Sequence, residues 1–219
     1  MKTRQTGFTL VEIAIVLVII GLLLGGILKG QEMIVQAKVK NSISDFSGIS
    51  AAYYGYQDRY RAIPGDDPGA TRWTTPTAAT AGNGDRILTG LYVPAQVTDE
   101  SALWWDHLRR SGFVTGAGVS NPVNSFAGLI GVQQGDGTGT GATAPAAVLG
   151  GFTNLLMCSA NLPDKVAIAL DVQMDDGNPA SGAVRGILAS GNPAISTGAT
   201  APSGFIETGT NVYTLCRQF

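Results

Sequence analysis

The sequence has few of the side chains on which most catalytic and metal sites depend. It contains one histidine, His107, and two cysteines that are far apart. A single histidine excludes a multi-histidine metal site, and the cysteines lack the CxxC spacing of zinc and thioredoxin-type sites. The glycine-rich run at 135–141 lacks the Gly-Lys-Ser/Thr ending of a phosphate loop. We therefore expect no enzyme, and we expect His107 to be a packing or surface histidine.

Charged residues are also scarce, and the chain is mildly acidic. They make up 14% of the 219 residues, the formal net charge is −2, and glycine occurs 30 times. This balance lacks the basic surface of nucleic-acid-binding domains, so we expect no nucleic-acid partner. The glycine content favours a loop-rich exported domain over a densely helical enzyme.

A long apolar run near the N-terminus is the strongest feature of the sequence. Within residues 8–28, Glu12 is the one charged side chain. As a helix this run measures about 31 Å at roughly 1.5 Å per residue, enough to cross a bilayer core of about 30 Å. A carboxylate in such a span costs about 2.5–3.5 kcal/mol at mid-helix and less near an interface. Glu12 therefore requires a partner; an interfacial acid in a plain membrane anchor is the alternative.

The residues around this run place a small-residue junction ahead of the apolar stretch. A short leader containing Lys2 and Arg4 ends at Gly7, and the run FTLVE follows from Phe8 to Glu12. An ordinary secretory signal has its small-residue cleavage site after the apolar stretch. The pattern resembles the N-termini of type IV pilins and type II secretion pseudopilins.

This resemblance implies how the chain is processed. A prepilin peptidase would cut after Gly7 and methylate the amino group of Phe8. The protein would be a single-pass protein of a bacterial inner membrane with its head in the periplasm. An inner-membrane assembly platform would then add it to a pilus or pseudopilus with copies of itself and other pilins or pseudopilins. There Glu12 would pair with the Phe8 amino group of a neighbouring subunit.

The sequence departs from typical major pilins at one position. Pilins often carry proline where this chain has Lys29. Any softening of the helix in this region must come from glycines instead. We therefore favour a minor pilin or a pseudopilin.

The helix is expected to continue beyond the membrane as an amphipathic segment. Apolar side chains recur every three or four residues, the period of one helix face: Val35, Val39, Ile43, Phe46, Ile49, Tyr53 and Tyr56. Pro64 and the turn residues after it end the helix near 59–63. We expect this stripe to pack on the protein's own head, with a seam for partner helices near the membrane as the alternative.

These features predict an α+β fold in four parts. We expect a leader at 1–7, a transmembrane and polymerisation helix at 8–28, an amphipathic helix at 29–61 and a globular head at 62–219. The N-terminal helix packs on the head, an antiparallel β-sheet with long glycine-rich loops. Within the head we predict a short amphipathic helix at 99–111 and strands at 126–132, 166–172, 183–188 and 211–216. The strands at 166–172 and 183–188 are expected to form a hairpin.

The two cysteines, Cys158 and Cys216, are candidates for a disulfide. An exported head would lie in an oxidising compartment, where disulfides persist. The bond would close a loop of about 58 residues and contribute about 4 kcal/mol in the chain-entropy model. A C-terminal segment stapled in this way resembles the disulfide-bounded region of type IV pilins. Two free buried thiols are the alternative.

Acidic loops offer oxygen ligands at two places. Asp175 and Asp176 follow the predicted strand that contains Asp171, and together they form a candidate calcium site. Acidic and amide residues between 66 and 85 form a second candidate, because calcium accepts several oxygen ligands with loose geometry. Aspartate and asparagine are also ordinary turn residues, so a plain loop is the alternative at both places. Calcium is the one ligand considered, and no other cofactor is expected.

The functional interpretations are ordered by these motifs. The first is a structural filament subunit that polymerises through its N-terminal helix. The second is a filament-tip adhesin or ligand-binding minor pilin, for which the candidate cluster is Arg59, Tyr60, Arg61, Arg72 and Trp73. The least favoured is a membrane-tethered exported enzyme, because no nucleophile motif supports it.

Overall fold

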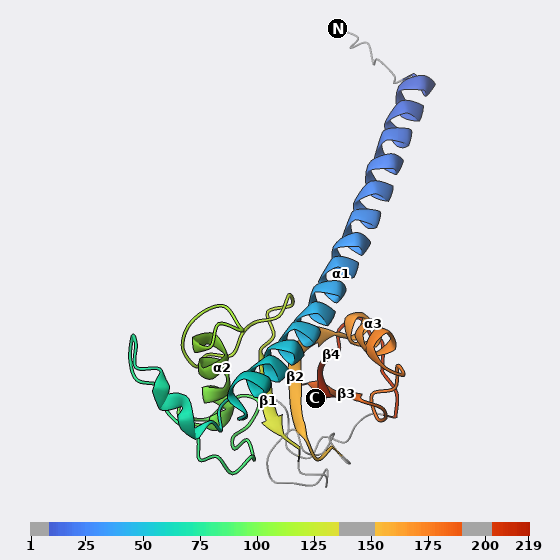
Figure 1. Cartoon of the computed structure of the whole chain (residues 1–219). Helices are drawn as coiled ribbons and strands as arrows, with labels where there is room; N and C mark the ends of the chain where they lie inside the picture. The colour runs from blue at the N-terminus through green and yellow to red at the C-terminus, as the bar shows by residue number, and fades with distance from the viewer. Residues whose placement is uncertain (1–8, 136–151, 190–202) are drawn as a thin grey trace. The chain divides into compact units, whose positions relative to one another are not determined.

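The computed structural model describes residues 9–135, 152–189 and 203–219 (Figure 1). The chain divides into two compact units, Met1–Lys38 and Val39–Phe219, which are described separately. The second unit combines helices with a four-stranded antiparallel sheet, so the α+β prediction is confirmed. Most of the glycine-rich run at 135–141 lies outside the described residues.

Helix α1 (Leu10–Tyr60) contributes to both units. It contains no proline, and it ends where Arg61 adopts a positive φ of 56°, with Pro64 shortly after. The predicted end near 59–63 is therefore confirmed. Among the described residues, α1 is the one helix long and apolar enough to cross a membrane.

Within the second unit, α1 packs on the head through the predicted stripe. Its members there are buried or partly buried: Val39, Ile43, Phe46, Ile49, Tyr53 and Tyr56. Burial of a large apolar side chain contributes about 1.5–3 kcal/mol, so this face fixes the helix to the head. Val35, in the first unit, is exposed.

The sheet has the strand order β1-β2-β4-β3, and every neighbouring pair is antiparallel. The strands are β1 (Ile130–Gln134), β2 (Leu155–Pro163), β3 (Val184–Ala189) and β4 (Val212–Gln218). The last strand therefore lies inside the sheet, between β2 and β3. Strands were predicted correctly at 183–188 and 211–216, whereas the one predicted at 126–132 begins at Ile130.

The strand predicted at 166–172 is wrong, because these residues belong to helix α3 (Asp164–Met174). The helix follows Pro163, which ends β2, and its buried residues lie on one helical face: Val166, Ala167, Leu170 and Asp171. A short apolar run does not by itself distinguish a strand from a buried helix. The predicted hairpin is also wrong, since β3 pairs with β4.

Helix α2 (Glu100–Arg110) confirms the helix predicted at 99–111, but it is buried on nearly every side. Trp104 and Trp105 are fully buried and meet edge to face, with ring centroids 4.8 Å apart. Even Glu100 is buried, and its carboxylate accepts the backbone N–H of Thr89 at 2.8 Å. Loops from either side of α2 in the sequence cover the face that was expected to be exposed.

Candidate functional site

The predicted processing residues, Gly7 and Phe8, lie outside the described residues, which begin at Thr9. Thr9 caps α1. Its backbone N–H and its hydroxyl both donate to Glu12 Oε2 at 2.8 Å, and the Glu12 N–H donates to Thr9 Oγ at 3.3 Å. This reciprocal arrangement is a capping box. The T-x-x-E spacing was present in the sequence as its signature, but the sequence analysis missed it.

The capping box leaves Glu12 able to bind a cation. Both hydrogen bonds from Thr9 end on Oε2, whereas a carboxylate has about four acceptor positions over its two oxygens. The neighbouring side chains Leu10, Val11 and Ile13 are apolar and exposed. The site is therefore a carboxylate oriented at the start of an apolar helix surface, a geometry suited to an ammonium partner.

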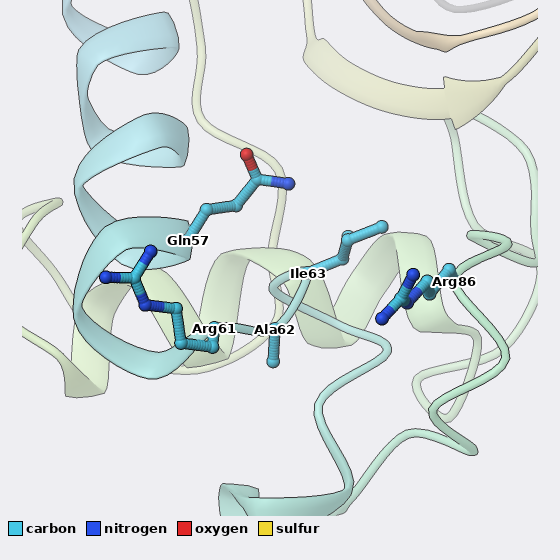
Figure 2. Close-up of a pocket in the computed structure, with 5 residues that line it drawn as sticks. All are labelled: Gln57, Arg61, Ala62, Ile63 and Arg86. Atoms are coloured by element: carbon cyan, nitrogen blue, oxygen red, sulfur yellow. The ribbon is translucent and has the colours of Figure 1, made fainter.

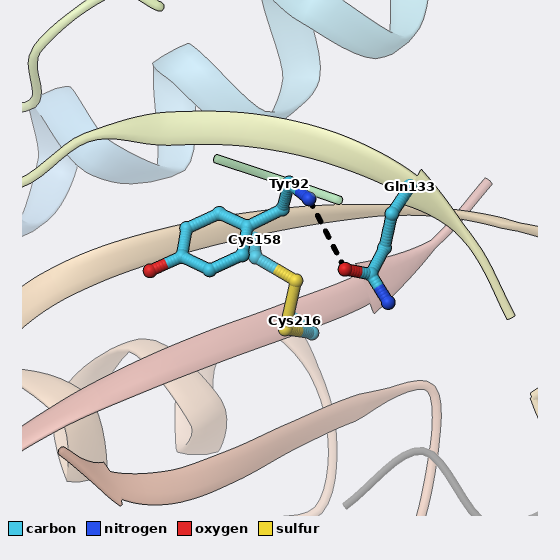
Figure 3. Close-up of a disulfide and its surroundings, with 4 residues drawn as sticks. All are labelled: Tyr92, Gln133, Cys158 and Cys216. Atoms are coloured by element: carbon cyan, nitrogen blue, oxygen red, sulfur yellow. Dashed lines mark hydrogen bonds between the residues drawn. A yellow bond between two sulfur atoms is a disulfide. The ribbon is translucent and has the colours of Figure 1, made fainter. Parts of the chain in front are cut away.

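Cys158 in β2 and Cys216 in β4 form a disulfide, so the alternative of free thiols is wrong. The two residues are direct partners in the strand register, with Cα atoms 4.0 Å apart, and both are fully buried. Figure 3 shows the bond beside Tyr92, whose backbone N–H donates to Gln133 Oε1 at 3.1 Å. The bond fixes the C-terminal strand to β2, as the sequence resemblance implied.

The acidic residues between 66 and 85 are already occupied by protein donors. Asp66 accepts backbone N–H groups of Gly84 and Arg86 at 2.6 and 2.7 Å. Asp67 forms an ion pair with Arg72 at 2.8 Å and accepts the Gly69 N–H at the same distance. These contacts organise the loop after α1. This part of the chain therefore does not support the calcium site considered there.

The other acidic candidates, Asp171, Asp175 and Asp176, do lie together. Each offers a carboxylate oxygen, and the three oxygens are all within 4.8 Å of one another. Asp171 is fully buried, Asp175 is half-buried and Asp176 is exposed. Burial, followed by the charges of Asp176 and Asp175, raises the pKa of Asp171 to about 7. Their position differs from the prediction, because Asp171 is on a helix and not on a strand.

The cationic and aromatic cluster proposed for ligand binding is partly structural. The Arg72 guanidinium lies 4.6 Å from the ring centroid of Tyr60 and 4.7 Å from that of Trp73, and it pairs with Asp67. Arg72 is therefore engaged within the head. Arg59 is also placed over Tyr60, at 5.3 Å.

A surface pocket of about 420 Å³ lies beside this cluster. It is lined by Gln57, Arg61, Ala62, Ile63 and Arg86, and Figure 2 shows Ile63 between the two arginines. The lining offers cationic and apolar contacts to a ligand. It contains no nucleophile paired with a base, so its chemistry suits binding better than catalysis.

His107 is fully buried and holds two loops together. The backbone N–H of Gly65 donates to Nδ1 at 2.9 Å, and Nε2 lies 2.8 Å from the carbonyl oxygen of Thr80. Only the neutral ring with its proton on Nε2 satisfies both partners. The expectation of a packing histidine is confirmed. Its partners lie 42 and 27 residues away in the sequence, so no local pattern identifies them.

The stability of the head is expected to depend on pH through His107. Burial lowers the pKa of His107, which outweighs the raising effects of the Thr80 carbonyl, Asp67 and Asp106, while Arg72 lowers it further. The unfolded state therefore binds the proton more readily. The stabilisation by His107 is complete above about pH 6.5 and decreases as the pH falls toward the lowered value.

This prediction is tested by comparing wild type with His107→Gln from pH 7.5 to 5.5. Fluorescence of the buried Trp104 and Trp105 reports unfolding of the head. The stability difference between the two proteins should shrink on acidification. Taking the difference cancels the titration of other groups, such as Asp171, whose raised pKa acts in the opposite direction. A difference that stays constant over this range would contradict the prediction.

Comparison with known proteins concerns the N-terminal segment. Residues 2–28 match the family described as the prokaryotic N-terminal methylation motif. A comparison with curated proteins found no match. The motif implies processing by a prepilin peptidase, and with the apolar helix it indicates a membrane-anchored exported protein. The chain thus carries the N-terminal methylation motif typical of type IV pilins and pseudopilins, and it is a type IV pilin-like protein.

Proposed function

We propose that this protein is a structural subunit of a type IV pilus-like filament or a type II secretion pseudopilus. Prepilin peptidase cuts after Gly7 and methylates Phe8, and the mature chain polymerises through residues 8–28. The observation that carries this proposal is the methylation motif over residues 2–28, placed directly at the start of helix α1.

The surface of the first half of α1 supports polymerisation. Most of its large apolar side chains, from Leu10 to Leu28, are exposed. Each contributes about 1.5–3 kcal/mol when buried, so the helix requires lipid or other helices around it. A Cβ atom added at Gly21, Gly25 or Gly26 would meet nothing within 4 Å. These glycines therefore leave room for close approach of neighbouring helices.

Glu12 supplies specificity to this otherwise uniform apolar surface. An apolar helix can slide along its neighbours at little cost, whereas a buried charge must find its partner. We propose that Glu12 binds the methylated ammonium of Phe8 on an adjacent subunit. The free acceptor positions of the capped Glu12 carboxylate support this role.

The proposed location and partners follow from this assembly. Before polymerisation the protein spans the bacterial inner membrane once through residues 8–28, and the head is in the periplasm. Its partners are prepilin peptidase, the inner-membrane assembly platform, copies of itself and other pilins or pseudopilins. Type IV pilins and pseudopilins are typically non-enzymatic, and we assign no catalytic activity to the chain.

A second candidate function is ligand binding by the head, as in a filament-tip subunit. The pocket lined by Arg61 and Arg86 favours it, because two arginines beside apolar Ile63 fit an anionic ligand with an apolar part. This function is compatible with filament assembly, since the pocket lies in the second unit.

The processing step tests the main proposal. Mass spectrometry of the protein from cells with active prepilin peptidase should find an N-terminus at methylated Phe8. Gly7→Leu should keep the leader uncut. Gly48→Leu makes the same change at an exposed site with open space around it and should be processed normally. An intact Met1 terminus in wild type, in the presence of active peptidase, would reject the proposal.

A further inference from the structure

The C-terminal end of α3 brings three carboxylates together around a buried position. Asp171 lies on the last turns of the helix, and Asp175 and Asp176 are the first residues after it. Their nearest oxygens are within 4.8 Å of one another. Three negative charges at this separation repel one another strongly unless protons or a cation offset them.

Asp171 is the unusual member of this group. It is fully buried, and neither of its carboxylate oxygens has a hydrogen-bond partner of normal geometry among the described residues. The backbone N–H of Gly177 has the smallest effect on its pKa, a weak lowering. An unsatisfied buried carboxylate costs several kcal/mol. Such a group requires a ligand or a proton.

The residues after α3 hold the other two carboxylates in place. The Val184 N–H donates to Asp175 Oδ2 at 2.9 Å. The Asn178 N–H and the Ser181 hydroxyl donate to the two oxygens of Asp176 at 2.8 and 2.6 Å. The cluster is therefore oriented by the fold and is not a set of freely rotating surface acids.

Close packing also restricts the position of Asp175. A Cβ atom at Gly182, which has a φ of 77°, would overlap Asp175 Oδ2. The position tolerates glycine both because of its positive φ and because the carboxylate lies against its backbone. The Asp175 carboxylate thus fills the space that any larger side chain at 182 would take.

We propose that Asp171, Asp175 and Asp176 form a divalent cation site whose preferred ion is Ca²⁺. The three ligands are all oxygens, which suits hard cations and not zinc or copper. Calcium binds oxygens at about 2.4 Å, so one ion reaches ligands that are up to about 4.8 Å apart. The flexible geometry of calcium also suits ligands from one helix end and one loop better than the strict octahedron of Mg²⁺.

Cation binding at this site would stabilise the head. It would link the end of α3 to the start of β3, because Asp175 is already hydrogen-bonded to Val184. β3 pairs along its length with β4, which carries Cys216 of the disulfide. The ion would therefore hold the helix against the part of the sheet that contains the C-terminal strand.

Thermal unfolding of the full chain in detergent micelles at pH 7.5 tests the proposal. Unfolding is followed by the fluorescence of Trp104 and Trp105, first with a chelator and then with calcium. Wild type should melt at a higher temperature in calcium, by roughly 5–10 °C when calcium is about 100 times its Kd. Calorimetry with calcium alone should show saturable binding at millimolar concentration or below.

Two variants distinguish cation binding from structural damage. Asp171→Asn and Asp176→Asn should each abolish most of the calcium-dependent shift. Asp171→Asn should melt no lower than wild type in chelator, because it removes a buried charge. Asp58→Asn, at a side chain that is 83% exposed, should respond to calcium like wild type.

Three outcomes would overturn the proposal. The first is a wild-type melting temperature that is the same in chelator and in millimolar calcium, with no binding heat. The second is an unchanged calcium shift in both Asp171→Asn and Asp176→Asn. The third is a larger stabilisation by Mg²⁺ than by Ca²⁺ at equal concentration, which would overturn the choice of ion.

Discussion

Replacing Glu12 with glutamine is expected to reduce incorporation into filaments by at least about 100-fold while leaving processing intact. Removing one partner from a buried ion pair costs about 3–5 kcal/mol, and each 1.4 kcal/mol corresponds to a factor of ten. In the proposed filament, the variant leaves the Phe8 ammonium without its partner inside an apolar helix bundle. The ratio of filament-bound to membrane-bound protein measures this loss.

The capping box allows the charge of Glu12 to be separated from its helix-forming role. Glutamine at this position preserves a capping box, so Glu12→Gln removes the charge alone, whereas Glu12→Ala removes both. Thr9→Val removes the hydroxyl that contacts Glu12 and keeps the carboxylate. Loss of a cap costs about 1 kcal/mol, so Thr9→Val should assemble far better than either Glu12 variant.

Mass spectrometry of the same samples provides the control for processing. All three variants should carry methylated Phe8, so that loss of assembly cannot be attributed to an uncut leader. Wild-type incorporation of Glu12→Gln would contradict an ion pair between Glu12 and Phe8. Equal loss in Thr9→Val and Glu12→Gln would instead assign the effect to the helix start.

Removal of the disulfide is expected to be the most destabilising change in the head. The bond joins residues 58 apart, and a loop of that length contributes about 4 kcal/mol in the chain-entropy model. Changing both Cys158 and Cys216 to alanine should therefore lower the Tm by roughly 8–15 °C. Alanine is preferred to serine because a hydroxyl would be buried without a partner in this apolar cluster.

The reduced wild-type chain is the matched control for this variant. It keeps both sulfur atoms but lacks the bond, so it separates loss of the cross-link from loss of side-chain volume. Because both cysteines are fully buried, reductant should act only after the head is unfolded. Trp fluorescence during melting compares the three forms. A double variant that melts within about 2 °C of oxidised wild type would contradict this prediction.

The sequence by itself was enough to locate the N-terminal site and its helix. Contacts there are local: Thr9 and Glu12 are three residues apart, and the apolar stripe follows the period of a single helix. Pro64 indicated where the helix ends, because its ring cannot continue one. The pair of cysteines left one disulfide to consider, and the structure confirmed it.

The head was predicted less well because its elements are defined by distant contacts. The short run at 166–172 contains residues compatible with either a strand or a buried helix, and packing against the sheet selected helix α3. The insertion of β4 between β2 and β3 depends on long-range pairing, for which neither turn chemistry nor periodicity gives a signal.

The candidate cation site shows the same division. Its three aspartates were identified from the sequence, since oxygen-rich turns are visible as residue types. Their chemistry was not, because the burial of Asp171 and the loss of its hydrogen-bond partners arise when α3 packs into the head. The sequence thus determined the local features of this protein, a capped apolar helix with a processing motif. Tertiary structure decided which polar groups lost contact with water, because burial is a property of packed elements and not of neighbouring residues.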